Sequence, residues 1–232
     1  MGLSFDPSFF FYEITVALSY IPMVTLLSAV PLIGGVALGT VLALCRIYHI
    51  PGWRRFAQAY VTALRSIPLL LQMFLAYFIT KAIYAVFGFD QLTLNKLGVV
   101  VVMLTLDAAG FLSEGIRSAL LSVEKGQYEA GYSVGLTGLQ VIRHIVLPQS
   151  LPVAVPIVGS SFIAIVKGSS AAYLLGIIEM IQGTAMKTAG NYRYLEAYCA
   201  VALMYWAITI LIEQLTGVAE KNVRLHMKGG VS

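Results

Sequence analysis

Three charged side chains stand inside long apolar stretches of this chain: Arg65, Asp107 and Lys167. Placing a charge within a membrane-spanning helix costs at least about 2.5–3.5 kcal/mol on insertion scales. Each of these residues therefore needs an opposite charge, water or a bound solute to offset that cost. The acid and the two bases can receive a small charged solute or pair with one another, and Asp107 can also carry a proton or an ion.

Motifs for catalysis are missing from the rest of the sequence. The chain has no Gly-x-x-x-x-Gly-Lys-Ser/Thr phosphate loop, so ATP hydrolysis is not assigned to it. His49, His144 and His226 lie far apart and form no metal-ligand pattern. There is no CxxC pair, nucleophile elbow or HExxH sequence either. We therefore predict that the chain is not an enzyme and holds no cofactor or metal of its own.

Membrane spans are the elements that must position the charged residues. The chain is 59% hydrophobic and only 11% charged, with mean hydropathy +0.84, whereas soluble domains carry about 25% charged residues. A bilayer requires about 20 apolar residues per span. We predict an all-α integral membrane protein with five spans: Met23–Leu44, about Val61–Thr80, Leu97–Leu112, about Leu151–Ile178 with an interruption at 167–170, and Ala197–Ile212.

Lysine and arginine in the connecting loops predict the orientation of these spans. The loops after the first, third and fifth spans are rich in basic residues, while the opposite side has few: Arg46, Arg54, Arg55, Arg117, Lys125, Arg143, Lys221, Arg224 and Lys228 against Lys81, Lys96, Lys187 and Arg193. The N-terminus is therefore expected outside and the C-terminus in the cytoplasm. Because the basic residues are spread over membrane flanks, the net charge of +4 does not indicate nucleic-acid binding.

A polar loop with an unusual pattern follows the third span. Residues 129–148 read EAGYSVGLTGLQVIRHIVLP. We predict a short helix from Gln127 to Leu136 with Tyr128, Tyr132 and Leu136 on one face and Gly135 as its stop. A second helix, Leu139 to Val146, is expected to end before Pro148. Glu129 suits the first helical turn and can also pair with Arg143.

This loop resembles the EAA loop of ABC importer permeases, with Gly131 in place of the second alanine as the departure from the pattern. The resemblance continues at Ser113–Arg117, at Ser122–Ala130 and at Ala219–Lys221. The segment Leu64–Gln72 is similar to the Arg-Gly-Thr-Pro-Leu-Leu-x-Gln segment of polar amino acid permeases of the histidine/glutamine/cystine type. In total the likeness covers roughly residues 25–228. Two further departures are Lys167-Gly168-Ser169-Ser170-Ala171, where the family often has Lys-Asp-Thr-Ser-Leu, and Asp107, where it commonly has a small polar residue.

The resemblance implies a five-helix type I importer permease in a bacterial cytoplasmic membrane. Its partners would be two ABC ATPase subunits carrying ATP and Mg, an extracytoplasmic amino acid binding protein, and a second copy or a sister permease. The implied layout is an interfacial segment at 1–20, a transmembrane domain at 21–217 with a coupling loop at 122–150, and a cytoplasmic tail at 218–232. The residues implied to contact the ATPase are Glu129, Ala130, Gly131, Gly135, Arg143, Ile145, Leu147 and Pro148.

An amino acid zwitterion would offer the intramembrane charges a carboxylate and an ammonium group. We hypothesise that Asp107 faces the ammonium while Arg65 or Lys167 faces the carboxylate. Helix breaks at Pro68 and at 168–170 would free backbone groups to line the cavity. The candidate binding set is Arg65, Ser66, Pro68, Gln72, Asp107, Lys167, Ser169 and Ser170. Lacking a second acid for a basic side chain, the set favours neutral polar or sulfur-containing amino acids.

Some of these residues also fit different roles. Asp107 can form a structural ion pair with Arg65 or Lys167, and Arg65 can instead extend toward the cytosolic interface. A gradient-driven secondary amino acid transporter would use Asp107 as its ion site, but such transporters usually show internal repeats. An intramembrane enzyme would have only Ser169 and Ser170 near Lys167 as its reactive groups. The sequence favours the ABC permease.

Overall fold

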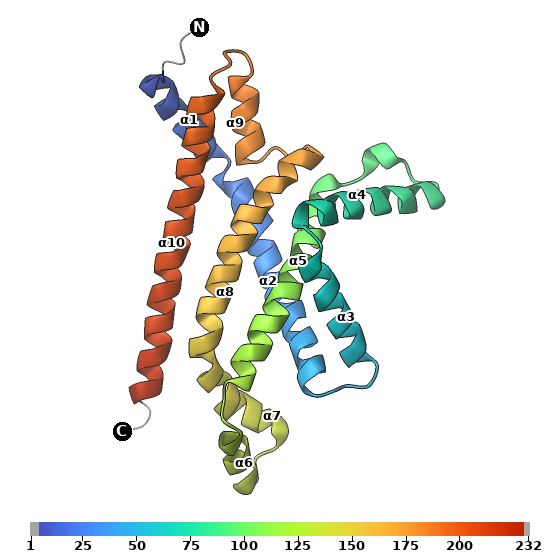
Figure 1. Ribbon diagram of the computed structural model, residues 1–232, viewed down its shortest axis with the longest axis vertical. Helices are drawn as coiled ribbons and strands as arrows, with labels where there is room; N and C mark the ends of the chain where they lie inside the picture. Colours follow the sequence, from blue (N-terminus) through green and yellow to red (C-terminus); the bar gives the residue numbers. More distant parts are fainter. Residues whose placement is uncertain (1–4, 230–232) are drawn as a thin grey trace.

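The computed structural model describes residues 5–229 and is helical, with no strand among those residues (Figure 1). Five helical stretches are long and apolar enough to cross a membrane: Ile21–Ile47, Leu69–Val86, Lys96–Leu121, Gly138–Leu175 and Tyr194–Leu225. The predicted all-helical class and the number of spans are confirmed. The positions 1–4 of the predicted N-terminal segment and 230–232 of the predicted tail lie outside the described residues.

The centre of the molecule is a bundle of α2 (Ile21–Ile47), α5 (Lys96–Leu121), α8 (Leu147–Ser169) and α10 (Tyr194–Gly229) (Figure 1). Glycines bring these helices close together. A methyl group added at Gly35 of α2 would lie 2.7 Å from Cβ of Ala108 in α5, and one added at Gly159 of α8 would lie 2.3 Å from a methyl carbon of Thr216 in α10. Small residues at such crossings are how membrane helices gain packing contacts without a hydrophobic driving force.

The second predicted span is not one helix. The chain forms α3 (Trp53–Ser66) and α4 (Leu69–Val86), with extended backbone at Ile67 between them. Proline disfavours helical backbone in the residue before it, which explains the break at Ile67–Pro68. In Figure 1 α4 turns away from α3 and runs across the direction of the bundle. The continuous span predicted from Val61 to Thr80 is therefore wrong, although the break predicted at Pro68 is confirmed.

The predicted interruption near residue 168 is also present. Helix α8 ends at Ser169, and a 3-10 segment, η3 (Ser170–Leu175), follows it. Gly176 then takes φ +79°, a left-handed conformation that glycine adopts at little cost. At the other end of the bundle α10 runs without a break past residue 217, so the boundary predicted there falls inside a helix.

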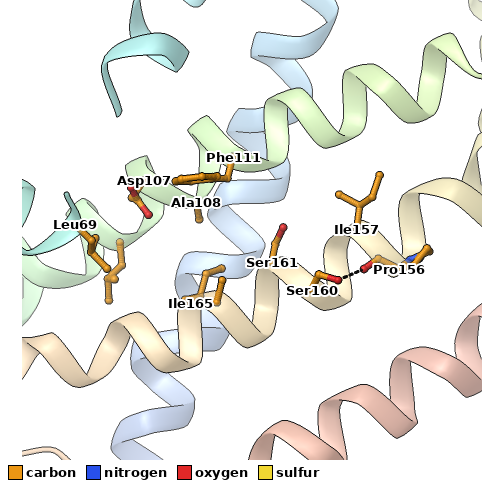
Figure 2. Close-up of a pocket in the computed structure, with 11 residues that line it drawn as sticks. Leu69, Asp107, Ala108, Phe111, Pro156, Ile157, Ser160, Ser161 and Ile165 are labelled. Carbon is orange, nitrogen blue, oxygen red and sulfur yellow. Dashed lines mark hydrogen bonds between the residues drawn. The ribbon is translucent and has the colours of Figure 1, made fainter. Parts of the chain in front are cut away.

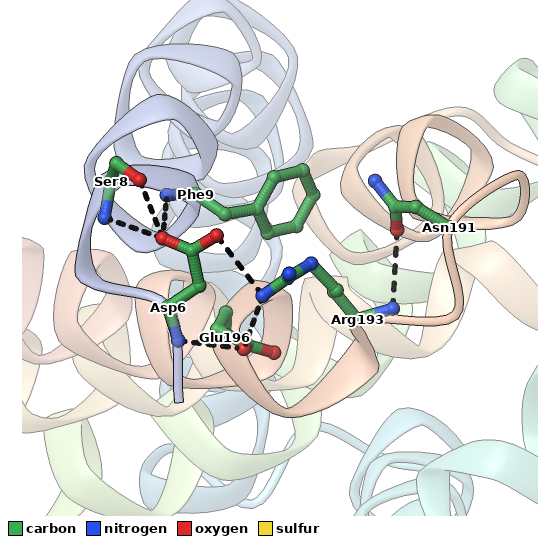
Figure 3. A network of polar contacts seen from close by, with 6 residues as sticks. All are labelled: Asp6, Ser8, Phe9, Asn191, Arg193 and Glu196. Atoms are coloured by element: carbon green, nitrogen blue, oxygen red, sulfur yellow. Dashed lines mark hydrogen bonds and ion pairs between the residues drawn. The ribbon is translucent and has the colours of Figure 1, made fainter. Parts of the chain in front are cut away.

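The N-terminal helix α1 (Pro7–Ser19) packs beside α10 and the short helix α9 (Met180–Thr188) (Figure 1). Asp6 caps α1, and a polar network ties this cap to the start of α10 (Figure 3). Arg193 Nη1 lies 3.1 Å from Asp6 Oδ2 and 3.4 Å from Glu196 Oε1, and Glu196 also accepts the backbone N–H of Asp6. The network fixes the N-terminal segment to one end of the bundle.

Candidate functional site

A cavity of about 440 Å³ lies between α5 and α8, with the first residue of α4 at its edge (Figure 2). Its wall is mostly apolar, and its polar groups are one carboxylate and two hydroxyls. The lining residues are Leu69, Leu104, Asp107, Ala108, Phe111, Pro156, Ile157, Ser160, Ser161, Ala164 and Ile165. Small-molecule sites commonly combine apolar walls with a few polar groups that orient the ligand.

Asp107 is held from behind by Gln72. The side-chain amide Nε2 of Gln72 donates to Asp107 Oδ1 over 3.0 Å, and it also contacts the carbonyl oxygens of Leu64 at 2.8 Å and Ile67 at 2.7 Å. These carbonyls belong to the end of α3, where the break before α4 leaves them without helical partners. Gln72 is buried, and through these hydrogen bonds its side chain links the helix break at Pro68 to the carboxylate in the cavity.

Neither candidate base forms an ion pair with Asp107 within residues 5–229. Arg65 is exposed and places its guanidinium over the ring of Phe111, 5.6 Å from the ring centroid. Lys167 is exposed too, and does not line the cavity. The alternative in which Asp107 locks the spans together through either base is therefore wrong for the single chain. Arg65 does not line the cavity either, but it packs on Phe111, whose side chain is part of the wall.

The remaining predicted binding residues do not gather at this cavity. Ser66 donates to the carbonyl of Thr62 on the exposed side of α3. Ser169 is buried and donates to the carbonyl of Val166, and Ser170 donates to the carbonyl of Lys167. Each hydroxyl thus donates to a backbone carbonyl three or four residues earlier in the chain. Pro68 acts through the backbone break, and it is exposed.

Of the lining residues, the predicted binding set contained only Asp107, and the aromatic ring of Phe111 and the hydroxyls of Ser160 and Ser161 are the chemically distinctive groups that it missed. Phe111 stands four residues after Asp107, and Ser161 stands four residues after Ile157, so each pair shares one face of a helix. Figure 2 shows Asp107 and Phe111 on α5 opposite Ser160 and Ser161 on α8. The helical spacing around Asp107 would have identified Phe111, whereas the pairing of α5 with α8 required the structure.

The polar loop forms α6 (Lys125–Ser133), α7 (Gly138–Val141) and a π-helical turn, η2 (Ile142–Val146), that leads into α8. Gly135 has φ +83° and its N–H donates to the carbonyl of Tyr132, while the N–H of Leu136 donates to the carbonyl of Gly131. This pair of bonds is the Schellman motif that ends helices at a left-handed glycine. The predicted stop at Gly135 is confirmed.

Two details of the predicted loop are wrong. The second short helix does not end before Pro148 but continues through the π-turn into α8, where Pro148 occupies the first turn. The π-turn carries the helix up to the proline: the N–H of Leu147 donates to the carbonyl of Ile142, five residues earlier, and Pro148, which has no N–H to donate, follows it. The first short helix also ends at Ser133, so Leu136 lies beyond it and does not extend the helix face of Tyr128 and Tyr132; Tyr132 is 54% exposed, whereas Tyr128 and Leu136 pack on the core.

The loop is fixed tightly to the ends of the spans. Tyr128 and Leu136 pack against a buried cluster that includes Leu120, Val141 and Val146. A methyl group added at Gly131 would lie 2.8 Å from side-chain carbons of both Val141 and Ile145. No ion pair joins Glu129 to Arg143 in the described part of the chain, and both residues are exposed, as are Ala130, Leu147 and Pro148. The outer face of the loop is free to contact another protein.

Comparison with known proteins places these features in a family. Residues 35–225 match the family described as "Binding-protein-dependent transport system inner membrane component". The L-cystine transport system permease protein TcyL of Bacillus subtilis is 35% identical over 207 residues, which are 89% of this chain and 86% of that protein. The glutamine transport system permease protein GlnP of Escherichia coli is 27% identical over 225 residues, 96% and 100% of the two chains. A crystal structure of an amino acid ABC transporter with histidines superimposes with TM-score 0.82 at 25% identity, covering 94% of this chain and 99% of the other.

Proposed function

The chain belongs to the family of binding-protein-dependent transport system inner membrane components, and on that premise we propose how it couples ATP hydrolysis to uptake. It is a multi-pass membrane protein and the permease subunit of an ABC importer for amino acids. In our proposal a separate ATPase binds the 122–150 loop and drives the cavity beside Asp107 through alternating access. The observation that carries this proposal is that the loop directly connects α5 to α8, the helices that line the cavity.

The connection of the loop to both α5 and α8 indicates how movement of the loop would reach the cavity. Helix α6 is joined to the end of α5 by the contact from Tyr128 Oη to the carbonyl of Leu120, 3.2 Å away. Segments α7 and η2 continue without a gap into α8. A displacement of the loop by the ATPase must therefore move α5 relative to α8, because packed helices shift as rigid elements. ATP-driven closure of two ATPase subunits would open the cavity outward.

The proposed substrate is a neutral polar or sulfur-containing amino acid. Asp107 presents a carboxylate to the cavity and would accept the ammonium group, while Arg65, which packs on Phe111 of the wall, would receive the carboxylate. Arg65 is preferred over Lys167 because its guanidinium packs on Phe111, which lines the cavity. The cavity wall carries one acid and no second one for a basic side chain. The likeness to an L-cystine permease supports this class.

The rest of the assembly is inferred from the family. We propose that two permease chains, identical or sister, form the membrane unit in a bacterial inner membrane. The N-terminus would face outward, where a binding protein delivers the solute, and the C-terminus and the loop would face the cytoplasm. The excess of arginine and lysine on the loop side supports this orientation.

Copurification with the cognate ATPase tests the coupling proposal. A tagged chain should retain the ATPase, and the complex should hydrolyse ATP faster when binding protein loaded with an amino acid is added. Chain that inserts normally but never retains an ATPase would overturn the proposal. A panel of amino acids offered to the binding protein and the complex would then identify the substrate, and exclusive stimulation by basic amino acids would contradict the proposed class.

A further inference from the structure

A second cavity, of about 340 Å³, lies at the loop end of the bundle and has a basic lining. It is formed by the end of α2, the turn after it, the start of α3 and the end of α5. The residues around it are Arg46, Ile47, His49, Arg54, Gln58, Arg117 and Leu121. Because α2 and α5 are membrane spans, the ends of these helices place the cavity at the level of the lipid headgroups.

Positive charge exceeds negative charge around this cavity. Glu114 is shared by two of its arginines: Arg46 Nη1 lies 2.7 Å from Glu114 Oε2, and Arg117 binds Glu114 Oε1. The buried Nη1 of Arg46 nevertheless lacks a correctly directed hydrogen bond. Arg54 has no carboxylate partner among the described residues. Three guanidinium groups therefore face a single carboxylate, which leaves donors for an anion with several oxygen atoms.

The backbone at the rim is held in an uncommon conformation. His49 has φ +54°, and its ring Nδ1 lies 2.8 Å from the carbonyl oxygen of Ile47. Residues other than glycine adopt the left-handed region at an energetic cost, and such conformations cluster at ligand sites and switches. The turn from Ile47 to Gly52 thus holds His49 in a costly backbone conformation in which the residue lines the cavity.

The surface beside the cavity is apolar and aromatic. Trp53 is 61% exposed and Phe56 is 56% exposed, and their rings meet edge to face with centroids 5.9 Å apart. Tryptophan at the membrane surface marks the headgroup level. Arg54 stands between these two aromatic residues in sequence and faces the cavity instead. Helix α3 therefore exposes aromatic rings to its surroundings and turns a basic group toward the cavity.

We propose that this cavity binds the phosphate group of an anionic phospholipid. Guanidinium groups suit phosphate because their paired N–H donors match its oxygen atoms. Arg54, with Arg46 and Arg117 behind it, would hold the phosphate, and the acyl chains would lie over Trp53 and Phe56. A free phosphate ion would satisfy the arginines but would make no use of the aromatic surface, so the lipid is the better occupant.

Trp53 itself can report the lipid. The chain has two tryptophans, so a Trp206→Phe variant leaves Trp53 as the sole indole. This variant would be reconstituted in mixtures of phosphatidylglycerol and phosphatidylcholine in which one or the other is brominated. A basic residue near an anionic surface contributes about 1 kcal/mol, so we expect phosphatidylglycerol to be favoured by about fivefold next to Trp53. Adding Arg54→Gln should bring that ratio close to one.

Arg55→Gln is the matched control, because Arg55 is the exposed neighbour that does not line the cavity. The Arg55→Gln variant should keep the preference for phosphatidylglycerol. Adding inorganic phosphate at constant ionic strength should leave this lipid preference unchanged. Equal loss in both arginine variants would reduce the effect to surface charge and overturn the proposal. If inorganic phosphate displaced phosphatidylglycerol from Trp53, the cavity would be a site for a free anion. If binding of the ATPase abolished the lipid preference, the cavity would be a protein contact. Both results would overturn the proposal.

Discussion

Asp107 keeps one carboxylate oxygen available because Gln72 holds the other. Oδ1 accepts from Gln72 Nε2, while Oδ2 has no hydrogen bond or ion pair within residues 5–229. Gln72 is in turn fixed by the carbonyls at the end of α3. The carboxylate is therefore oriented before a solute enters, and such preorganisation lowers the cost of binding.

Replacing Asp107 by Asn removes the negative charge while preserving the shape of the side chain. A hydrogen bond to a charged group contributes about 1.5–3 kcal/mol, so we expect binding of the amino acid to weaken by roughly 10–100-fold. Equilibrium binding to the purified complex measures this change. The control is Asp90→Asn, which removes a charge from an exposed cap but keeps the capping oxygen. Unchanged binding and transport in folded Asp107→Asn protein would contradict the assigned role.

Glu13 provides a prediction about pH. Its side chain is fully buried, and among residues 5–229 only the Thr188 hydroxyl of α9 donates to it, over 3.3 Å. Burial raises the pKa of Glu13 above its ordinary value of 4.5, and the hydrogen bond from Thr188 opposes this in part. The pKa of Glu13 is therefore higher in the folded state than in the unfolded chain. With respect to this group, the folded protein is most stable below the unfolded-state pKa, and that stability is lost as pH rises through the folded-state pKa.

The Glu13→Gln variant should therefore melt at a higher temperature than the parent at pH 8, with the difference shrinking toward pH 5. Thermal unfolding in detergent across this range measures the effect. Burial also raises the pKa of Glu179, but that contribution is common to both proteins and cancels in the comparison. Exposed Glu124→Gln is the control and should show no pH-dependent difference. A Glu13→Gln variant that is less stable than the parent at pH 8 would refute this account.

At the scale of residues, the sequence identified the carboxylate but not its surroundings. Asp107 stood out as a charge in an apolar run, and Gln72 was included through the segment around Pro68. Their contact across 35 residues depends on how α3, α4 and α5 pack, which no local pattern specifies. Ser169 was grouped with them by proximity to a helix break, yet helix rotation places it in the buried core away from the cavity.

Helical elements were predicted best where a strong local cause acts. Pro68 ends α3 because proline excludes helical backbone before it, and Gly135 ends α6 because it takes positive φ. The direction of α4 was not predictable, since hydrophobicity continues through the bend and says nothing of angle. At Pro148, in contrast, the sequence predicted the end of a helix, and the structure continues into α8. A proline in the first turn of a helix looks the same in sequence as one that terminates the helix before it.

The proposed coupling through the 122–150 loop can be tested at Gly131. A leucine there would meet Val141 and Ile145, which a methyl group alone would already approach to 2.8 Å. We expect Gly131→Leu to displace α6, and overpacking of this kind costs about 1–3 kcal/mol. The ATPase retained on the tagged chain should fall, while membrane insertion is unchanged.

Gly126→Leu is the matched variant, because the same helix has open space around Gly126. It should retain more ATPase than Gly131→Leu. Equal retention by the two variants would mean that bulk on the loop surface, and not the packing of α6, controls the interaction.

At the scale of the whole molecule, the polar network at the N-terminal helix and the 122–150 loop lie at opposite ends of one bundle (Figure 1). The network of Asp6, Arg193 and Glu196 ties the termini of α1 and α10 at one end (Figure 3). At the other end the 122–150 loop joins α5 to α8, with the cavity of Asp107 between those helices (Figure 2). A force applied at the loop can thus reach the cavity without passing through α1 or α9.

The central claim is that ATP, and not an ion gradient, drives uptake through this chain. Proteoliposomes would hold the chain with its ATPase and binding protein, and uptake of a labelled amino acid would be followed. We expect uptake only with ATP on the ATPase side, and no effect when proton and sodium gradients are collapsed. Uptake that persists without ATP but disappears with the gradient would contradict the account and make Asp107 the ion site of a secondary transporter.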